Sequence, residues 1–255
     1  YGSDWSIFGD RVYGGSLMAQ RPFSRFSRID CSLNYLVLER DLYTVYDYDP
    51  YYYFPYTSGG TKLDGVHAVT VTGNLVHDNT LWSYTGPANG SRYVFNVEHA
   101  PDIAQTDLSY TTVELDYRKY ARIGRKYTFV TRLSGGGSFG KDPRLFFLGG
   151  DQGWLNARVS WIGPEIERSQ DIFFSRQNYP LRGFRWNEFY GRRFFLTNFE
   201  FRFPFIDYLI LGWPLRFGIT NIAGVFFTDI GAAWGKNMLV DSDDGQTAVL
   251  VYNDS

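Results

Sequence analysis

The chain has 255 residues, of which 19% are aromatic and 20% are charged, and its formal net charge is −2. This apolar content excludes a disordered or fibrous protein, and the near-neutral charge provides no broad basic field for nucleic acid. The mean hydropathy is −0.28, and no apolar run approaches the roughly 18 residues of a membrane-spanning helix. The single cysteine, Cys31, excludes a disulfide framework and a cysteine-based metal cluster.

Polar and apolar residues alternate with a period of two along most of the chain, which predicts about eight β-strands. In chain order, the candidate strands are 5–19, 28–37, 65–78, 91–98, 109–120, 125–134, 192–204 and 214–234. The segment 109–120 is a clear example, because Glu114 and Asp116 share one face while Val113 and Leu115 share the other. No long amphipathic helix is predicted, so the expected fold class is all-β.

Two architectures explain this alternation. In a soluble sandwich the apolar faces are inside, whereas in an outer-membrane barrel aromatic side chains meet lipid and charged side chains line the lumen. Three features favour the transmembrane antiparallel barrel. The strands are long enough for a tilted crossing of about 9–11 residues, the polar faces carry charges of both signs such as Glu114 and Arg132, and the apolar faces are rich in Tyr and Phe.

The connections between the predicted strands alternate in length. Short ones fall near 20–25, 84–91 and 120–125, long ones at 39–64 and 139–190. This alternation is typical of outer-membrane barrels, which have short periplasmic turns and long outer loops. Asn89-Gly90 within the second short connection predicts a tight hairpin. The acidic, tyrosine-rich part of 39–64 is either a self-packing surface loop or a recognition surface.

Small motifs identify no catalytic, metal or cofactor site. Residues 135–140 match G-x-G-x-x-G, but no helix is predicted after them, so we expect a glycine-rich strand end. Glu114 and Asp116 could form a glycosidase-like pair, although a charged lumen wall gives the same pattern. The acidic segment 241–245 lacks the glutamate of a calcium loop. No metal-ligand spacing connects the three histidines, His67, His77 and His99. No enzyme activity is therefore expected.

Four segments in the second half of the chain form an ordered set. They are Phe146-Phe147-Leu148-Gly149-Gly150, Pro180-Leu181-Arg182-Gly183-Phe184, 195–204 and 224–234. The first resembles the F-x-G-G entry to a long sixth loop, and the second resembles the V/I-R-G-F/Y tip of that loop. The last two resemble the following strands, with a lumen glutamate and a lumen aspartate. Together they resemble the Omp85, or bacterial surface antigen (D15), barrel family.

The resemblance is best over 139–234 and weaker over 22–138. Within that weaker part, 22–30 and 78–93 are similar to the branch of the family in which the barrel follows a TolB-like propeller. Omp85 barrels have sixteen strands, so the resemblance implies that 1–255 is a single barrel segment holding approximately strands six to thirteen. The alternative is a closed barrel of eight strands.

The resemblance also implies a site. The long loop 139–190 would fold back into the lumen, where Arg182 at its tip would pair with Glu200 and Asp229 on the inner wall. Gly183 would allow the tight backbone at the tip, and Phe184 completes the motif. We call Arg182, Gly183 and Phe184 the loop-tip lock, and Glu200 and Asp229 its lumen partners. The alternative is that Arg182 is an exposed loop arginine.

By the same resemblance, the chain is expected in the bacterial outer membrane, where such barrels assemble or translocate other polypeptides. Its expected partners are outer-membrane lipid and other outer-membrane or periplasmic proteins, with no cofactor and no nucleic acid. One alternative is an outer-membrane barrel that only anchors a larger surface complex. A more remote alternative is a soluble β-sandwich enzyme or lectin.

Overall fold

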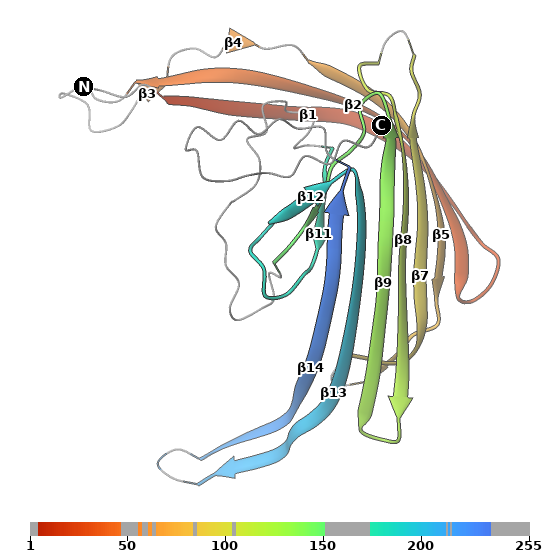
Figure 1. Cartoon of the computed structure of the whole chain (residues 1–255), viewed down its shortest axis with the longest axis vertical. Coiled ribbons are helices and arrows are strands. Elements are labelled where there is room, and N and C mark those ends of the chain that lie inside the picture. The colour runs from red at the N-terminus through yellow and green to blue at the C-terminus, as the bar shows by residue number, and fades with distance from the viewer. Residues whose placement is uncertain are drawn as a thin grey trace.

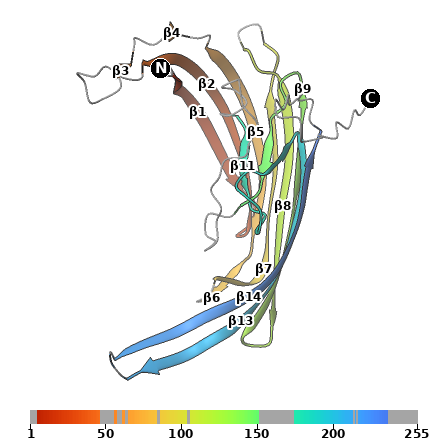
Figure 2. The same cartoon turned by 60° about the vertical axis from the view of Figure 1, so that its left-hand side comes forward.

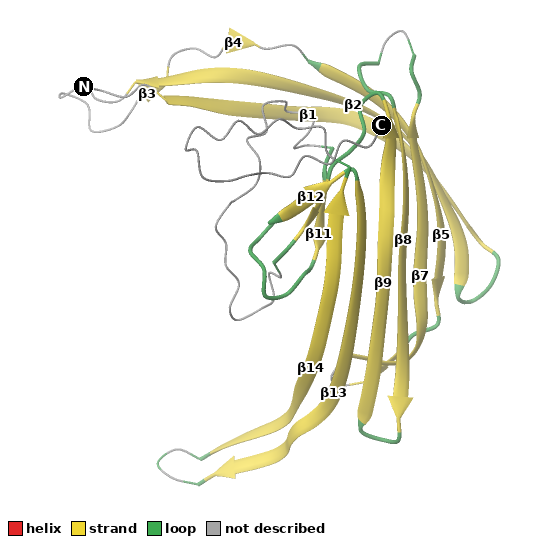
Figure 3. Ribbon diagram, in the orientation of Figure 1, coloured by secondary structure: helices red, strands yellow, loops and turns green. Residues whose placement is uncertain are grey.

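The computed structural model describes residues 5–46, 56–57, 61–62, 65–83, 86–103, 106–150, 174–212, 214 and 216–235. All regular elements in these ranges are strands (Figure 3). No helix in the described part of the chain is long and apolar enough to span a membrane.

Eight long strands form one antiparallel sheet in the order β1-β2-β5-β7-β8-β9-β13-β14 (Figure 1). Their bounds are β1 Trp5–Pro22, β2 Ser27–Tyr46, β5 Val66–Asp78, β7 Gly86–Ala100, β8 Tyr110–Ile123, β9 Tyr127–Gly140, β13 Arg193–Leu211 and β14 Phe217–Trp234. Three short strands extend the sheet: β3 Tyr56–Thr57 and β4 Thr61–Lys62 pair with β2, and β6 Leu81–Ser83 pairs with β7. All eight predicted strands are present, and several are longer than predicted.

The two faces of the sheet differ as the alternation predicts. The convex face is apolar and exposed, with Leu33, Val71, Phe95, Leu115, Phe129, Leu133, Phe195, Phe199 and Ile230 among its side chains. The concave face carries the polar set, including Thr70, Thr72, Glu98, Thr112, Ser134, Ser138 and Asn198, all of them buried. An exposed aromatic face is unfavourable in water but suits lipid, so the inverted pattern of a membrane barrel holds and the sandwich alternative is wrong.

The sheet is curved but not closed (Figure 2). Strands β1 and β14 each pair with a single long neighbour, so both outer edges of the described sheet are open. A closed barrel of eight strands is therefore not what this chain forms in this structure.

A second, three-stranded sheet lies on the concave side of the first (Figure 2). It contains β10 Phe146–Leu148, β11 Arg176–Tyr179 and β12 Phe189–Gly191, with β10 in the middle. These strands belong to the predicted long loop, which runs from the end of β9 to the start of β13. The described part of this loop thus lies inside the curve of the sheet.

The hairpin predicted at Asn89-Gly90 needs correction. Asn89-Gly90 does not form a hairpin turn, because both residues lie inside β7, where Leu81 of β6 pairs with Asn89. Gly90 has φ +105°, and a Cβ there would lie 2.5 Å from the carbonyl oxygen of Asn79. The glycine serves a local irregularity in the strand and a close backbone approach.

Other connections lie near their predicted places. The turn after β8 covers residues 124–126, and the glycine-rich segment 135–140 forms the end of β9, as expected. The loop predicted at 39–64 starts later, because β2 continues to Tyr46. The acidic segment 241–245 lies outside the described residues.

Candidate functional site

The strand register aligns charged side chains on the concave wall. One row across four neighbouring strands contains Arg118, Arg132, Asn198 and Asp229, in that order. Glu200 lies two residues along β13 from Asn198, on the same face. The pairing of β13 with β14 therefore brings Glu200 and Asp229 together on one face, although they are about 30 residues apart in the chain.

Arg182 of the loop contacts both carboxylates. Its Nε and Nη2 donate to the two carboxylate oxygens of Asp229 at 2.7 and 2.6 Å, and its Nη1 donates to Oε1 of Glu200 at 2.7 Å. Its backbone N–H also donates to Oδ2 of Asp229 at 3.0 Å. The planar guanidinium thus serves two carboxylates at once, with the bidentate geometry that lysine cannot provide.

The contact is shielded from solvent. The side chains of Arg182, Glu200 and Asp229 are 10%, 17% and 2% exposed, and the Arg182 guanidinium lies 3.9 Å from the ring centroid of Phe227. Burial lowers the pKa of Arg182, but its hydrogen bonds to Asp229 and Glu200 outweigh this and raise the pKa above its ordinary value. Arg182 is therefore charged in this arrangement, and the buried carboxylate of Asp229 depends on it for charge neutralisation.

The other two residues of the loop-tip lock lie differently. Gly183 has φ +90°, which fits the tight backbone expected at the tip, and a Cβ there would meet open space. Phe184 is 42% exposed and contacts Phe189 edge to face, with 5.1 Å between ring centroids. The structure thus brings Arg182 to the two carboxylates, whereas Phe184 packs within the loop.

An apolar cluster seats the loop beside the charged contact. Its buried members are Phe146, Leu148 and Leu181 of the loop and Phe194 and Leu196 of β13. Small residues on the wall make room for them. A Cβ on Gly136 would lie 3.0 Å from the Phe194 ring and 2.7 Å from the carbonyl oxygen of Val113, and a Cβ on Gly231 would lie 3.3 Å from Leu181. Gly136, one of the glycines predicted as a strand end, therefore lies beside the surface on which the loop docks.

A second set of ion pairs holds the base of the loop, and the sequence did not point to it. Glu98 on β7 is 7% exposed at its side chain. It pairs with Arg144, at the entry of the loop, at 2.6 Å and with Arg176, on the returning limb, at 3.0 Å. Tyr110 donates its hydroxyl to the same carboxylate at 2.6 Å. Glu98 therefore joins both limbs of the loop to the wall.

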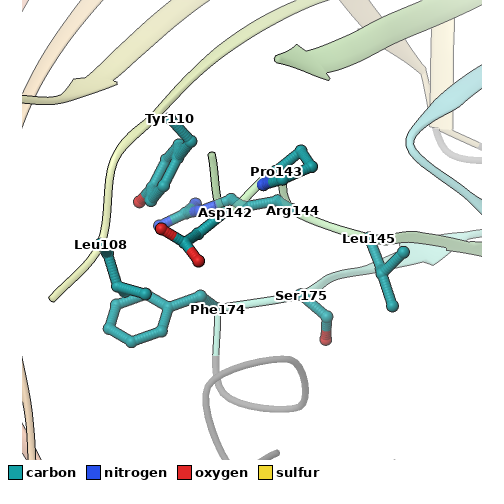
Figure 4. Close-up of a pocket in the computed structure, with 8 residues that line it drawn as sticks. All are labelled: Leu108, Tyr110, Asp142, Pro143, Arg144, Leu145, Phe174 and Ser175. Atoms are coloured by element: carbon teal, nitrogen blue, oxygen red, sulfur yellow. The ribbon is translucent and has the colours of Figure 1, made fainter. Parts of the chain in front are cut away.

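Arg144 is further fixed by aromatic rings. Its guanidinium carbon lies 4.6 Å from the Tyr110 ring centroid and 5.5 Å from that of Phe174. Figure 4 shows the Arg144 side chain between these two rings. Such stacking is favourable for arginine in particular. The polar alternation of 91–98 could have singled out Glu98, but its partners lie in loop segments without periodicity.

The predicted carboxylate pair is not available for catalysis in this arrangement. Glu114 accepts a hydrogen bond from the Tyr179 hydroxyl at 2.7 Å and pairs with Arg176 at 3.2 Å. Asp116 pairs with Arg118 at 2.8 Å and with Arg132 at 2.5 Å. Both carboxylates are neutralised by arginines, which agrees with a charged lumen wall. No group of three or more His, Cys, Asp or Glu suitable for a metal ion occurs among the described residues.

Comparison with known proteins agrees with this geometry. The sequence model of the Omp85 superfamily domain matches residues 3–249. No curated protein sequence matches the chain. Among the solved structures similar to it is BamA from Haemophilus ducreyi lacking POTRA domains 1–3, with 16% sequence identity and a TM-score of 0.54.

That likeness concerns the fold alone. It covers 89% of this chain but 42% of the BamA chain, so this chain spans less than half the length of that structure. The family match, in contrast, extends over nearly the whole chain. The chain therefore belongs to the Omp85 superfamily of bacterial outer-membrane barrels.

Proposed function

We propose that this chain is part of a barrel that assembles or translocates other polypeptides at the outer membrane, and that it supplies the barrel's loop-tip lock. The observation that carries the proposal is the contact of Arg182 with Glu200 and Asp229, which fixes the long loop against the inner wall. Omp85-type barrels insert polypeptides by β-augmentation at a weak seam. A loop fixed inside the barrel would keep the wall formed by β13 and β14 in one shape.

We further propose that 1–255 corresponds to approximately strands six to thirteen of a sixteen-stranded barrel. Two features support this assignment. The described sheet has eight long strands, and its outer strands β1 and β14 each leave one edge open. Unpaired backbone groups at a strand edge are unfavourable in lipid, so in the membrane these edges need further strands as partners. On this assignment the chain carries the lock but not the seam.

The proposed function involves no catalysis. The wall carboxylates that could act as acid and base, Glu114 and Asp116, are engaged by arginines and a tyrosine. Outer-membrane lipid is the proposed partner of the convex face, because that face is apolar and exposed. Omp85 proteins work with other outer-membrane and periplasmic proteins in complexes, and we propose such partners for this protein as well.

The test uses the full-length protein reconstituted in lipid vesicles. Arg182→Met removes the charge of the lock, and Arg122→Met is the matched control at the far end of β8. We expect Arg182→Met, but not Arg122→Met, to slow the insertion of an unfolded outer-membrane protein into the vesicles. If Arg182→Met loosens the loop while insertion is unchanged, the lock does not serve assembly, and a barrel that only anchors a surface complex becomes the better proposal.

A further inference from the structure

A cavity lies between the loop tip and the inner wall. Its volume is about 140 Å³, room for several water molecules or one small oxyanion. Pro180 and Arg182 of the loop form one side of it, and polar side chains of β8, β9 and β13 form the other. A space that the ion pairs of Arg182 do not fill therefore remains between the docked loop tip and the wall.

The walls of this cavity carry an excess of positive charge. Four arginines line it: Arg118, Arg132, Arg182 and Arg202. Three carboxylates pair with them: Asp116, Glu200 and Asp229. The balance is therefore four positive charges against three negative ones, within the part of the chain that the structure describes. One further negative charge would make this set of charged groups electrically neutral.

Two of the carboxylates are each shared by two arginines. Asp116 receives hydrogen bonds from both Arg118 and Arg132. Glu200 receives them from Arg182 through one oxygen and from Arg202 through the other. A shared carboxylate neutralises each of its partners only in part, so the guanidiniums around the cavity keep attraction for an anion.

Asn198 adds an acceptor to this ring of donors. It is 7% exposed, it lines the cavity, and its side-chain oxygen has no hydrogen-bond partner. Its amide also hydrogen bonds to Asp229, which leaves the oxygen as the unpaired end. A buried acceptor without a donor is unfavourable. A ligand that suits the site would accept from arginines and donate one hydrogen bond to Asn198.

We propose that this cavity binds a protonated oxyanion of the phosphate class. Dihydrogen phosphate has one negative charge, oxygens that can accept from the N–H groups that Arg118 and Arg132 do not donate to Asp116, and an O–H that can donate to Asn198. Sulfate has the same shape but no proton at neutral pH, so it leaves Asn198 unpaired. The ligand is either free phosphate or the phosphomonoester group of a lipid, since a phosphodiester has no O–H to donate.

Binding would be linked to the lock. Arg182 supplies one side of the cavity only when the loop tip is docked. An anion that binds the docked state more tightly than the undocked state shifts the loop toward docking by mass action. Phosphate would therefore stabilise the loop. This inference depends on the docked tip and not on the proposed role in polypeptide assembly.

The test is titration calorimetry on the full-length protein in detergent. Inorganic phosphate and sulfate are compared at equal ionic strength, and a water-soluble short-chain phosphatidic acid distinguishes the lipid source from the free ion. We expect saturable phosphate binding, with sulfate and the variant Arg132→Gln each weaker by about tenfold, which is about 1.4 kcal/mol. Arg122→Gln, outside the cavity, should bind phosphate as the wild type does.

Three results would overturn the inference: no saturable binding of either phosphate form, equal affinity for sulfate and phosphate, or binding that Arg132→Gln does not weaken. Arg118→Gln is the second variant if Arg132→Gln fails to fold, which heat-modifiable migration in detergent gels reports. Saturable phosphate binding by the wild type, together with unchanged client insertion in Arg182→Met, would count against the proposed function alone.

Discussion

Replacing Arg182 by methionine removes the charge of the lock while it keeps much of the side-chain volume. The Arg182 side chain donates three hydrogen bonds of 2.6–2.7 Å to carboxylates. Glu200 would keep Arg202 as a partner, with Nη2 at 2.7 Å from Oε2. Asp229, at 2% side-chain exposure, would lose its only ion pair among the described residues. The loss of stability in Arg182→Met therefore comes mainly from the buried, unpaired carboxylate of Asp229.

The expected magnitude follows from these contacts. Removing one partner of a buried ion pair lowers stability by about 3–5 kcal/mol. We expect Arg182→Met to lower the free energy of unfolding by about 3 kcal/mol, the lower end of that range, because Asp229 keeps the backbone N–H of residue 182. Arg182→Lys should have a free energy of unfolding between those of the wild type and Arg182→Met, because lysine keeps the charge but not the planar fork.

The assay is urea unfolding of the full-length protein in lipid vesicles, together with limited proteolysis of the loop 141–192. A double-mutant cycle of Arg182→Met and Asp229→Asn isolates the pair, and we expect a coupling energy of about 1–3 kcal/mol. Additive effects of the two substitutions, with the loop equally resistant to protease in every variant, would refute the reasoning.

Three further substitutions test the rest of the structure. Glu98→Gln should release the base of the loop, because Arg144 and Arg176 lose their shared carboxylate; faster proteolysis after Arg144 and Arg176 is the expected readout, and unchanged cleavage would contradict it. Gly136→Ala should strain the pairing of β9 with β8 and lower the heat-modifiability midpoint, because its Cβ would lie 2.7 Å from the carbonyl oxygen of Val113, whereas Gly73→Ala should be neutral because a Cβ there meets nothing within 4 Å. Leu115→Arg places a charge on the convex face. It should lower the free energy of unfolding in vesicles by up to about 2–4 kcal/mol, the value for the bilayer midplane. Asn96→Arg on the concave face should be tolerated, and equal effects of the two arginines would argue against a lipid-facing convex side.

The strands of this fold are predictable from the sequence because their signal is local. Alternation places Glu114 and Asp116 on one face and Leu115 on the other, and the structure keeps that division. The alternation alone did not decide between barrel and sandwich, because both have a period of two. Strand length and the charges on the polar faces favoured the barrel, and the exposed convex face with a loop on the concave side agrees with that choice.

The pairing at the loop tip was predictable for a different reason. Nothing local in Arg182 distinguishes it from the other arginines, and its assignment came from the family resemblance of the segments around it. The pairing of Glu98 with Arg144 and Arg176 had no such support, since its members are 46 and 78 residues apart in the chain. Loops without periodicity give no register, so the sequence offered no means of matching these partners.

The hairpin predicted at Asn89-Gly90 shows where local turn chemistry misleads. This dipeptide is a strong turn signal when it joins two alternating strands directly. Here β6 continues the pairing past it, and Gly90 uses its positive φ inside the strand. The positive φ that glycine allows is used here for a bulge-like irregularity within the strand and not for a turn. The local sequence is compatible with both.

The most direct test of the docked loop is amide hydrogen exchange at Arg182 in the full-length protein in lipid. The backbone N–H of Arg182 donates to Asp229 at 3.0 Å in a site where the side chains are largely shielded from water. The docked loop predicts slow exchange at this amide and a marked acceleration in Asp229→Asn. Exchange at the rate of a free loop in the wild-type protein would contradict the lock.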